Sequence, residues 1–233
     1  MKKESKIKIS RNSCIRCGTC CIKGGPVLHH EDKRILLEGY VSHQHLLTIR
    51  KGEPAINPVT GRLEPAPQEL IKVRGKDEGW SCLFYNEKKA ACTIYKNRFI
   101  ECRLLKCWDT SDLISIMGKD TITRSDIINP DDPIVDVIKT QERECSYNEI
   151  ENLISNISGG INKSLSLEKL REIIQKDISI RSFSIKELGL KKDLELFIFG
   201  RPLFKVLSDL GLSLGLSVRI PDAFASRSLQ GDH

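Results

Sequence analysis

The chain has 233 residues, of which 39% are hydrophobic, and this is enough apolar content to bury a core. No run approaches the roughly 20 apolar residues that a membrane-spanning helix needs, and no signal-like apolar stretch follows the opening M-K-K-E-S-K, so we predict a cytoplasmic protein without a membrane partner. In that reducing compartment, nine cysteines favour metal binding over disulfides.

The net charge of +6 is unevenly distributed. Residues 1–110 carry a net charge of +9, whereas residues 111–233 carry −3, and the basic half also contains most of the cysteines. Sites built from four thiolates are anionic, so much of the positive excess can neutralise them. We do not expect a nucleic-acid partner, because the Lys and Arg residues are scattered and no aromatic residues are interleaved with them.

A cysteine-rich loop is the first notable feature in chain order. Ile7 and Ile9 alternate with lysines, which predicts a short edge strand leading into the loop. The turn K-G-G-P ends the loop, and we interpret His29 and His30 as polar turn residues. The apolar residues of 31–50 then predict a helix.

The loop itself reads C-I-R-C-G-T-C-C and holds four thiols within eight residues. Cys14, Cys17 and Cys20 recur at a fixed spacing, which directs three thiolates toward one centre, as in bacterial ferredoxin loops. Cys21 diverges from its neighbour Cys20, so it would reach a second metal or a different corner of a cluster. These thiols are the first candidate metal ligands.

A second cysteine group follows a Pro- and Gly-rich stretch. Residues 51–68 predict a hairpin with N-P-V-T-G-R at its tip, and residues 70–73 predict a strand. Short aromatic and β-branched segments on either side of N-E-K-K predict another small hairpin, and a helical turn is expected from about Lys96. The cysteines of this second group are Cys82, Cys92, Cys102 and Cys107.

The last third of the chain has helical patterns and one further cysteine. We predict a helix start at Pro133, a helix over 166–176, and a helical region over 188–210 that Gly200 divides. Cys145 lies in this region and is interpreted as a spare thiol. The predicted fold class is α+β, with a cysteine-rich metal-binding domain of short strands and hairpins over residues 1–115 and a mainly helical region over residues 116–233 packed on it.

The cysteine patterns C-x2-C-G-x-C-C, C-L-F, C-T-I-Y-x2-R and C-R-x4-C together resemble the cysteine-cluster family of the YkgJ proteins, a zinc- or iron-chelating domain. Phe99 departs from the Pro that the family usually has there, and C-R-L-L-K-C departs from the frequent C-R-x-F/Y-P. The ligands implied by the resemblance are Cys14, Cys17, Cys20, Cys21, Cys82, Cys92, Cys102 and Cys107.

Ligand type alone allows either iron–sulfur or zinc. The triple C-x2-C-x2-C spacing suits the separate irons of a [4Fe–4S] cluster, and the second group has no C-x-x-C pair of the kind that zinc ribbons use, so we favour an iron–sulfur cluster over Zn²⁺. One cysteine of the second group would hold the fourth iron. A single polynuclear centre that uses both groups is the alternative.

Two arginines are candidate cofactor-binding residues. Arg98 and Arg103 flank Cys102, where they could offset thiolate charge and donate hydrogen bonds to sulfur, and surface ion pairing is their alternative role. The predicted function is electron transfer or assistance to a redox enzyme, with a redox enzyme or electron donor as protein partner. The alternatives are a zinc-stabilised interaction module and, because flagellin lysine N-methylase has a similar cysteine motif, a protein-modifying enzyme.

Overall fold

The computed structural model describes residues 14–77 and 79–212, and these divide into two compact units that alternate along the chain. The first unit contains the described residues of Met1–Ser42 and Lys72–Thr121, and the second contains those of His43–Ile71 and Ile122–His233. The predicted domains divide the chain once, at residue 115, whereas residues 43–71 are grouped by their contacts with the later part of the chain. The edge strand predicted around Ile7 and Ile9 lies outside the described residues.

The early part of the first unit consists of single helical turns. These are α1 (Thr19–Ile22), η1 (His30–Asp32) and α2 (Lys33–Leu37). The predicted helix over 31–50 is wrong: α2 ends at Leu37, and Gly39 then adopts a left-handed φ of 74°, which an α-helix does not accommodate.

The later part of the first unit carries the second cysteine group on short elements. Strand β5 (Tyr85–Asn86) pairs antiparallel with β6 (Ala91–Cys92), as the predicted hairpin required. The chain continues through η3 (Tyr95–Asn97), α3 (Ile100–Leu104) and α4 (Ser111–Ile116). Cys102 lies on α3 and Cys107 follows it, which confirms the predicted helical turn.

A small core and one buried carboxylate join the two parts of the first unit. Leu28, Val73 and Phe99 are at most 1% exposed. The buried carboxylate of Asp32 accepts hydrogen bonds from the backbone N–H of His29, at 3.0 Å, and of Ile100, at 2.9 Å. It therefore ties the turn after the cysteine loop to the start of α3.

The strands of the second unit follow the sequence prediction in part. Strand β1 (Leu46–Ile49), which the sequence placed in a helix, pairs with β4 (Leu70–Val73), in which the chain passes back to the first unit. Between them, β2 (Pro54–Ile56) and β3 (Leu63–Pro65) form the predicted hairpin.

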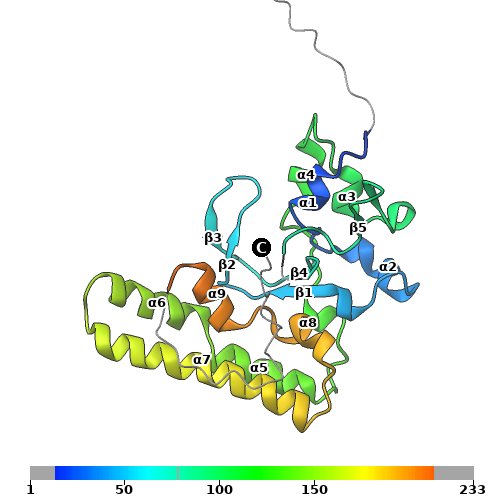
Figure 1. Ribbon diagram of the computed structural model, residues 1–233. Coiled ribbons are helices and arrows are strands. Elements are labelled where there is room, and N and C mark those ends of the chain that lie inside the picture. Colours follow the sequence, from blue (N-terminus) through cyan, green and yellow to red (C-terminus); the bar gives the residue numbers. More distant parts are fainter. Residues whose placement is uncertain (1–13, 78, 213–233) are drawn as a thin grey trace, which may run out of the picture. The chain divides into compact units, whose positions relative to one another are not determined.

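Helices make up most of the second unit. Helix α7 (Lys163–Lys186) packs along α5 (Ile134–Glu144) and α6 (Tyr147–Ser158) (Figure 1). Helix α7 starts at Lys163, one turn before the start predicted at residue 166. Helix α6 ends at Ser158. Gly200 separates α8 from α9 as predicted, and no described helix is long and apolar enough to cross a bilayer. The helical elements are η2 (His43–His45), η4 (Arg124–Asp126), α5 (Ile134–Glu144), α6 (Tyr147–Ser158), α7 (Lys163–Lys186), η5 (Lys192–Leu194), α8 (Glu195–Phe199) and α9 (Leu203–Asp209).

Buried ion pairs accompany the apolar core of the second unit. Arg181, 1% exposed, donates to Asp177 and to Glu195, in each case at 2.9 Å. Gln141 and the backbone N–H of Leu203 also donate to the Asp177 carboxylate. We call the full set the ion-pair network; it comprises Arg50, Arg124, Arg181 and Arg201 with Glu53, Glu69, Glu142, Asp177 and Glu195.

Candidate metal centre

The two cysteine groups meet in the first unit. The backbone N–H of Cys82 donates a 2.7 Å hydrogen bond to the carbonyl of Cys21, which joins the early loop to the later hairpin. Gly18 adopts φ 77° and approaches Tyr85 so closely that a Cβ at this position would overlap the tyrosine hydroxyl. The early loop is therefore packed directly against the β5–β6 hairpin, although about 60 residues separate them in the sequence.

Five thiols from these two groups lie close enough to influence one another electrostatically. Cys20 and Cys21 share a hydrogen bond. The charges of Cys82 and Cys102 raise the pKa of Cys21, and the charge of Cys92 raises the pKa of Cys102. Cys82 is buried, Cys20 is exposed and the other three are partly buried. We call this set the thiol cluster; its members are Cys20, Cys21, Cys82, Cys92 and Cys102.

Neighbouring groups separate the pKa values of these thiols. The hydrogen bond from Cys21 lowers the pKa of Cys20 to about 6, because it stabilises the thiolate. The same hydrogen bond, together with burial and the Cys20 charge, raises the pKa of Cys21. Burial raises the pKa of Cys82, Cys92 and Cys102, and Arg98 opposes this rise at Cys92.

The remaining predicted ligands are exposed. The thiol of Cys17 lies 3.3 Å from the Thr19 hydroxyl, and this hydrogen bond lowers the pKa of Cys17. The charge of Cys20 has a weaker effect in the opposite direction. Cys14 accepts a backbone hydrogen bond from Arg16, and Cys107 follows the end of α3. Among the described residues, no three His, Cys, Asp or Glu side chains are arranged as a metal site. Ligation by all eight cysteines therefore stays a prediction.

The two predicted cofactor-binding arginines occupy different environments. Arg98 stacks on the Tyr95 ring, with its guanidinium carbon 3.8 Å from the ring centroid, and its charge lowers the pKa of Cys20. Arg103 instead forms a 2.5 Å ion pair with Glu31, in which both side chains are more than 40% exposed. The structure thus places Arg98 beside the thiol cluster, and it gives Arg103 the surface ion pair considered as its alternative role.

One buried pair beside the thiol cluster was not predicted. His29, taken as a polar turn residue, is 3% exposed, and its Nε2 lies 3.4 Å from the Glu101 carboxylate. Glu101 also accepts a 2.7 Å hydrogen bond from the backbone N–H of Val27, and the bond to His29 raises the histidine pKa. Because Glu101 precedes Cys102 on α3, the pair fixes the helix that carries a cluster thiol.

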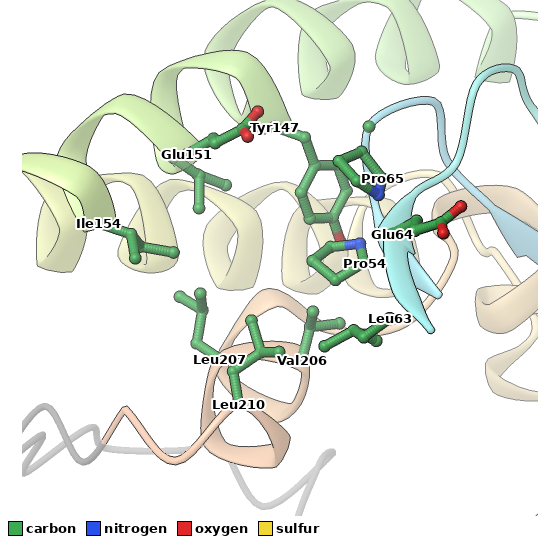
Figure 2. A pocket seen from close by; sticks show the side chains of 12 residues that line it. Pro54, Leu63, Glu64, Pro65, Tyr147, Glu151, Ile154, Val206, Leu207 and Leu210 are labelled. Carbon is green, nitrogen blue, oxygen red and sulfur yellow. The ribbon is translucent and has the colours of Figure 1, made fainter. Parts of the chain in front are cut away.

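The second unit offers a different environment. Cys145 is completely buried among apolar side chains, and burial raises its pKa to about 12. A cavity of about 210 Å³ lies between the β2–β3 hairpin, α6 and α9 (Figure 2). Its wall is mainly apolar and includes Leu63, Tyr147 and Val206, so it lacks the grouped thiols found in the first unit.

Short elements that gather thiols around a small core define the first unit as a cysteine-rich domain of the metal-binding class. The family model CxxCxxCC, described as "Putative zinc- or iron-chelating domain", matches residues 13–126. This part of the chain is therefore similar to the family that the cysteine spacing predicted, and the match supports metal binding by the first unit. No curated protein and no solved structure matched the chain.

Proposed function

We propose that the first unit holds an iron–sulfur cluster, [4Fe–4S], and serves in electron transfer or as an accessory to a redox enzyme. The observation that carries the proposal is the backbone contact between Cys21 and Cys82, which brings thiols from both sequence groups together. Cys14, Cys17 and Cys20 would bind three irons, and a cysteine of the later group the fourth. When bound, such a cluster supplies one-electron chemistry.

The chemistry of the thiol cluster fits this role. Thiolate is the ligand form that both iron–sulfur clusters and zinc require, and Cys20 has a pKa of about 6, so it already favours that form at neutral pH. The more buried thiols must lose their protons as metal binds. Arg98 provides a positive charge beside Cys20 and Cys92 that offsets part of the accumulated thiolate charge.

A zinc-stabilised interaction module is the second candidate. It is favoured by the construction of the first unit, whose longest described helix, α4, has six residues and whose strands β5 and β6 have two residues each. Elements this short gain little stability alone, so a bound metal would supply folding energy. In either case we propose a protein partner in the reducing cytoplasm, where the thiols would remain available for the metal.

Anaerobic purification followed by iron, zinc and acid-labile sulfide analysis tests the proposal. We expect a brown protein with iron and sulfide in equal amounts. Cys102→Ser should lose most of the metal because Cys102 lies within the thiol cluster, whereas Cys145→Ser, the matched control from the second unit, should retain it. A colourless protein with stoichiometric zinc would replace this proposal with the second candidate.

A further inference from the structure

Two arginines of the first unit share one aromatic ring at the edge of the thiol cluster. The guanidinium carbon of Arg98 lies 3.8 Å from the centroid of the Tyr95 ring, and that of Arg16 lies 4.5 Å from the same centroid. Arg98 is anchored further by a 3.0 Å hydrogen bond from its Nε to the Tyr95 carbonyl. We call these three side chains the Arg–Tyr stack.

Both positive charges of the stack lack a carboxylate partner among the residues that the structure describes. Among described residues, no Asp or Glu lies within ion-pair distance of Arg16 or Arg98, whereas Arg34 and Arg103 of the same unit pair with Glu38 and Glu31. A guanidinium stacked on a ring keeps its N–H donors in its own plane, where they remain available to an oxyanion. Arg98 has used only Nε, so its two terminal nitrogens are not engaged in any described hydrogen bond.

The position of Arg16 brings this donor set next to the candidate ligands. It lies between Cys14 and Cys17 and has a φ of 56°, which is uncommon for a residue with a side chain. The positive charge of Arg98 acts on Cys20, so both arginines lie near cysteines of the loop. A ligand that contacts both guanidiniums would therefore lie beside the thiols without using any of them.

We infer that the Arg–Tyr stack is a binding site for the carboxylate group of a small ligand. Arg16 and Arg98 would donate to the two carboxylate oxygens, and Tyr95 would hold the guanidiniums in place. A carboxylate is planar, so its oxygens can lie in the plane of a guanidinium's N–H donors. The inference goes beyond the proposed function, since it involves no metal ligand and holds for iron or zinc.

Isothermal titration of the purified, metal-loaded protein with sodium acetate tests this site. We expect saturable binding that Arg16→Gln weakens by about tenfold or more, because one charge-assisted hydrogen bond is lost. Arg16→Lys should also bind more weakly, since lysine keeps the charge but cannot form the planar fork. Tyr95→Leu, which keeps both charges, should lower the affinity several-fold.

Arg34→Gln is the matched control, because it removes one exposed arginine from the same unit. It should bind acetate like the wild type, and metal analysis of every sample separates failure of this site from failure of the metal proposal. Equal affinity in the wild type and Arg16→Gln would overturn the inference and identify acetate as a ligand of the metal or of the general surface. Tighter binding of inorganic phosphate or of a short oligonucleotide than of acetate would also overturn it.

Discussion

The two units of this protein are stabilised by different chemistry. In the first unit, one- and two-turn helices and two-residue strands surround eight thiols, of which seven are exposed or only partly buried and Cys82 is buried. In the second, α7 runs for 24 residues, and its buried face carries both apolar side chains and the charged pair Asp177 and Arg181. Long helices with a continuous core can fold by burial alone, whereas short elements need an additional source of stability.

The contrast also explains where reactive groups can occur. The hydrogen-bonding groups of Arg181 are satisfied by carboxylates and carbonyls of its own unit, so this charge is committed to structure. Arg16 and Arg98 of the first unit have no carboxylate partner among the described residues. Buried charge in the second unit therefore supports the fold, while charge in the first unit stands next to groups that can bind ligands.

Metal removal should produce the largest difference between the two units. We expect residues 79–121 to lose protection from hydrogen exchange in metal-free protein, because a structural metal can contribute about 10 kcal/mol to folding. Helices α5, α6 and α7 should remain protected, since the core of the second unit contains no proposed ligand. Hydrogen-exchange mass spectrometry with and without metal measures both regions in one sample, and unchanged protection in residues 79–121 would contradict the proposed difference.

Asp177→Asn should destabilise the second unit by about 3–5 kcal/mol. The change leaves the buried guanidinium of Arg181 without one of its carboxylates, which is the costly way to break a buried ion pair. Urea unfolding followed by circular dichroism measures the loss. Glu172→Gln is the control on the same helix, because Glu172 is exposed, and it should unfold at nearly the wild-type urea concentration. Similar losses in the two variants would show that the ion-pair network has no special role.

Glu142→Gln should have a smaller, pH-dependent effect. Burial favours a raised pKa for Glu142, but hydrogen bonds and charges from Arg50 and Arg124 outweigh burial and lower it from its ordinary value of 4.5. A lowered carboxyl pKa stabilises the folded state above the ordinary value, and this contribution disappears as pH falls through the folded-state pKa. We expect a loss of about 1–3 kcal/mol at pH 7, reduced from the full cost of a buried pair because Glu142 is 37% exposed.

Unfolding curves for this variant and the wild type should therefore converge as the pH is lowered from 7 toward 3. Glu144→Gln is a suitable control, because Glu144 lies on the same helix but pairs with the exposed Lys176. A difference between wild type and Glu142→Gln that stays constant over this pH range would show that the charge of Glu142 is not the source of its effect.

Gly18→Ala should have a modest effect on folding but a clear effect on metal content. A left-handed φ costs a residue with a side chain about 1–2 kcal/mol, and the new Cβ would also displace Tyr85. Gly39→Ala provides the matched control, since Gly39 has a similar φ of 74° but open space around its Cβ position. Gly39→Ala should lose only the cost of the left-handed φ, Gly18→Ala should lose somewhat more because Tyr85 must move, and only Gly18→Ala should bind less metal. Full metal content in Gly18→Ala would argue against the packed loop as part of the centre.

The turns and hairpins of this fold could be predicted from the sequence because Pro, Gly and β-branched residues mark them directly. The helix predicted over 31–50 failed for a physical reason. Strand β1 is buried at all four positions, so it lacks the alternation that identifies a strand, and its leucines were assigned to a helical pattern.

The proximity of the thiol groups was predicted by cysteine spacing, but the side chains around them were not. Nothing in the sequence distinguishes His29 from the exposed His30, because burial of His29 depends on Glu101, which lies 72 residues away. Asp177 and Arg181 look like an ordinary surface pair on a helix, since their four-residue spacing is the same in either case. Such contacts arise only from tertiary packing.

The interleaved path of the chain has a consequence for synthesis on the ribosome. Leu46, Leu47 and Ile49 of β1 pack in the second unit, and the Thr48 hydroxyl bonds to the Phe197 carbonyl, 149 residues later. At elongation rates of about 5–20 residues per second, that apolar strand would wait roughly 7 to 30 seconds for its partner helix to be translated. The nascent chain therefore exposes an aggregation-prone segment, and chaperones that shield it during translation would favour correct assembly.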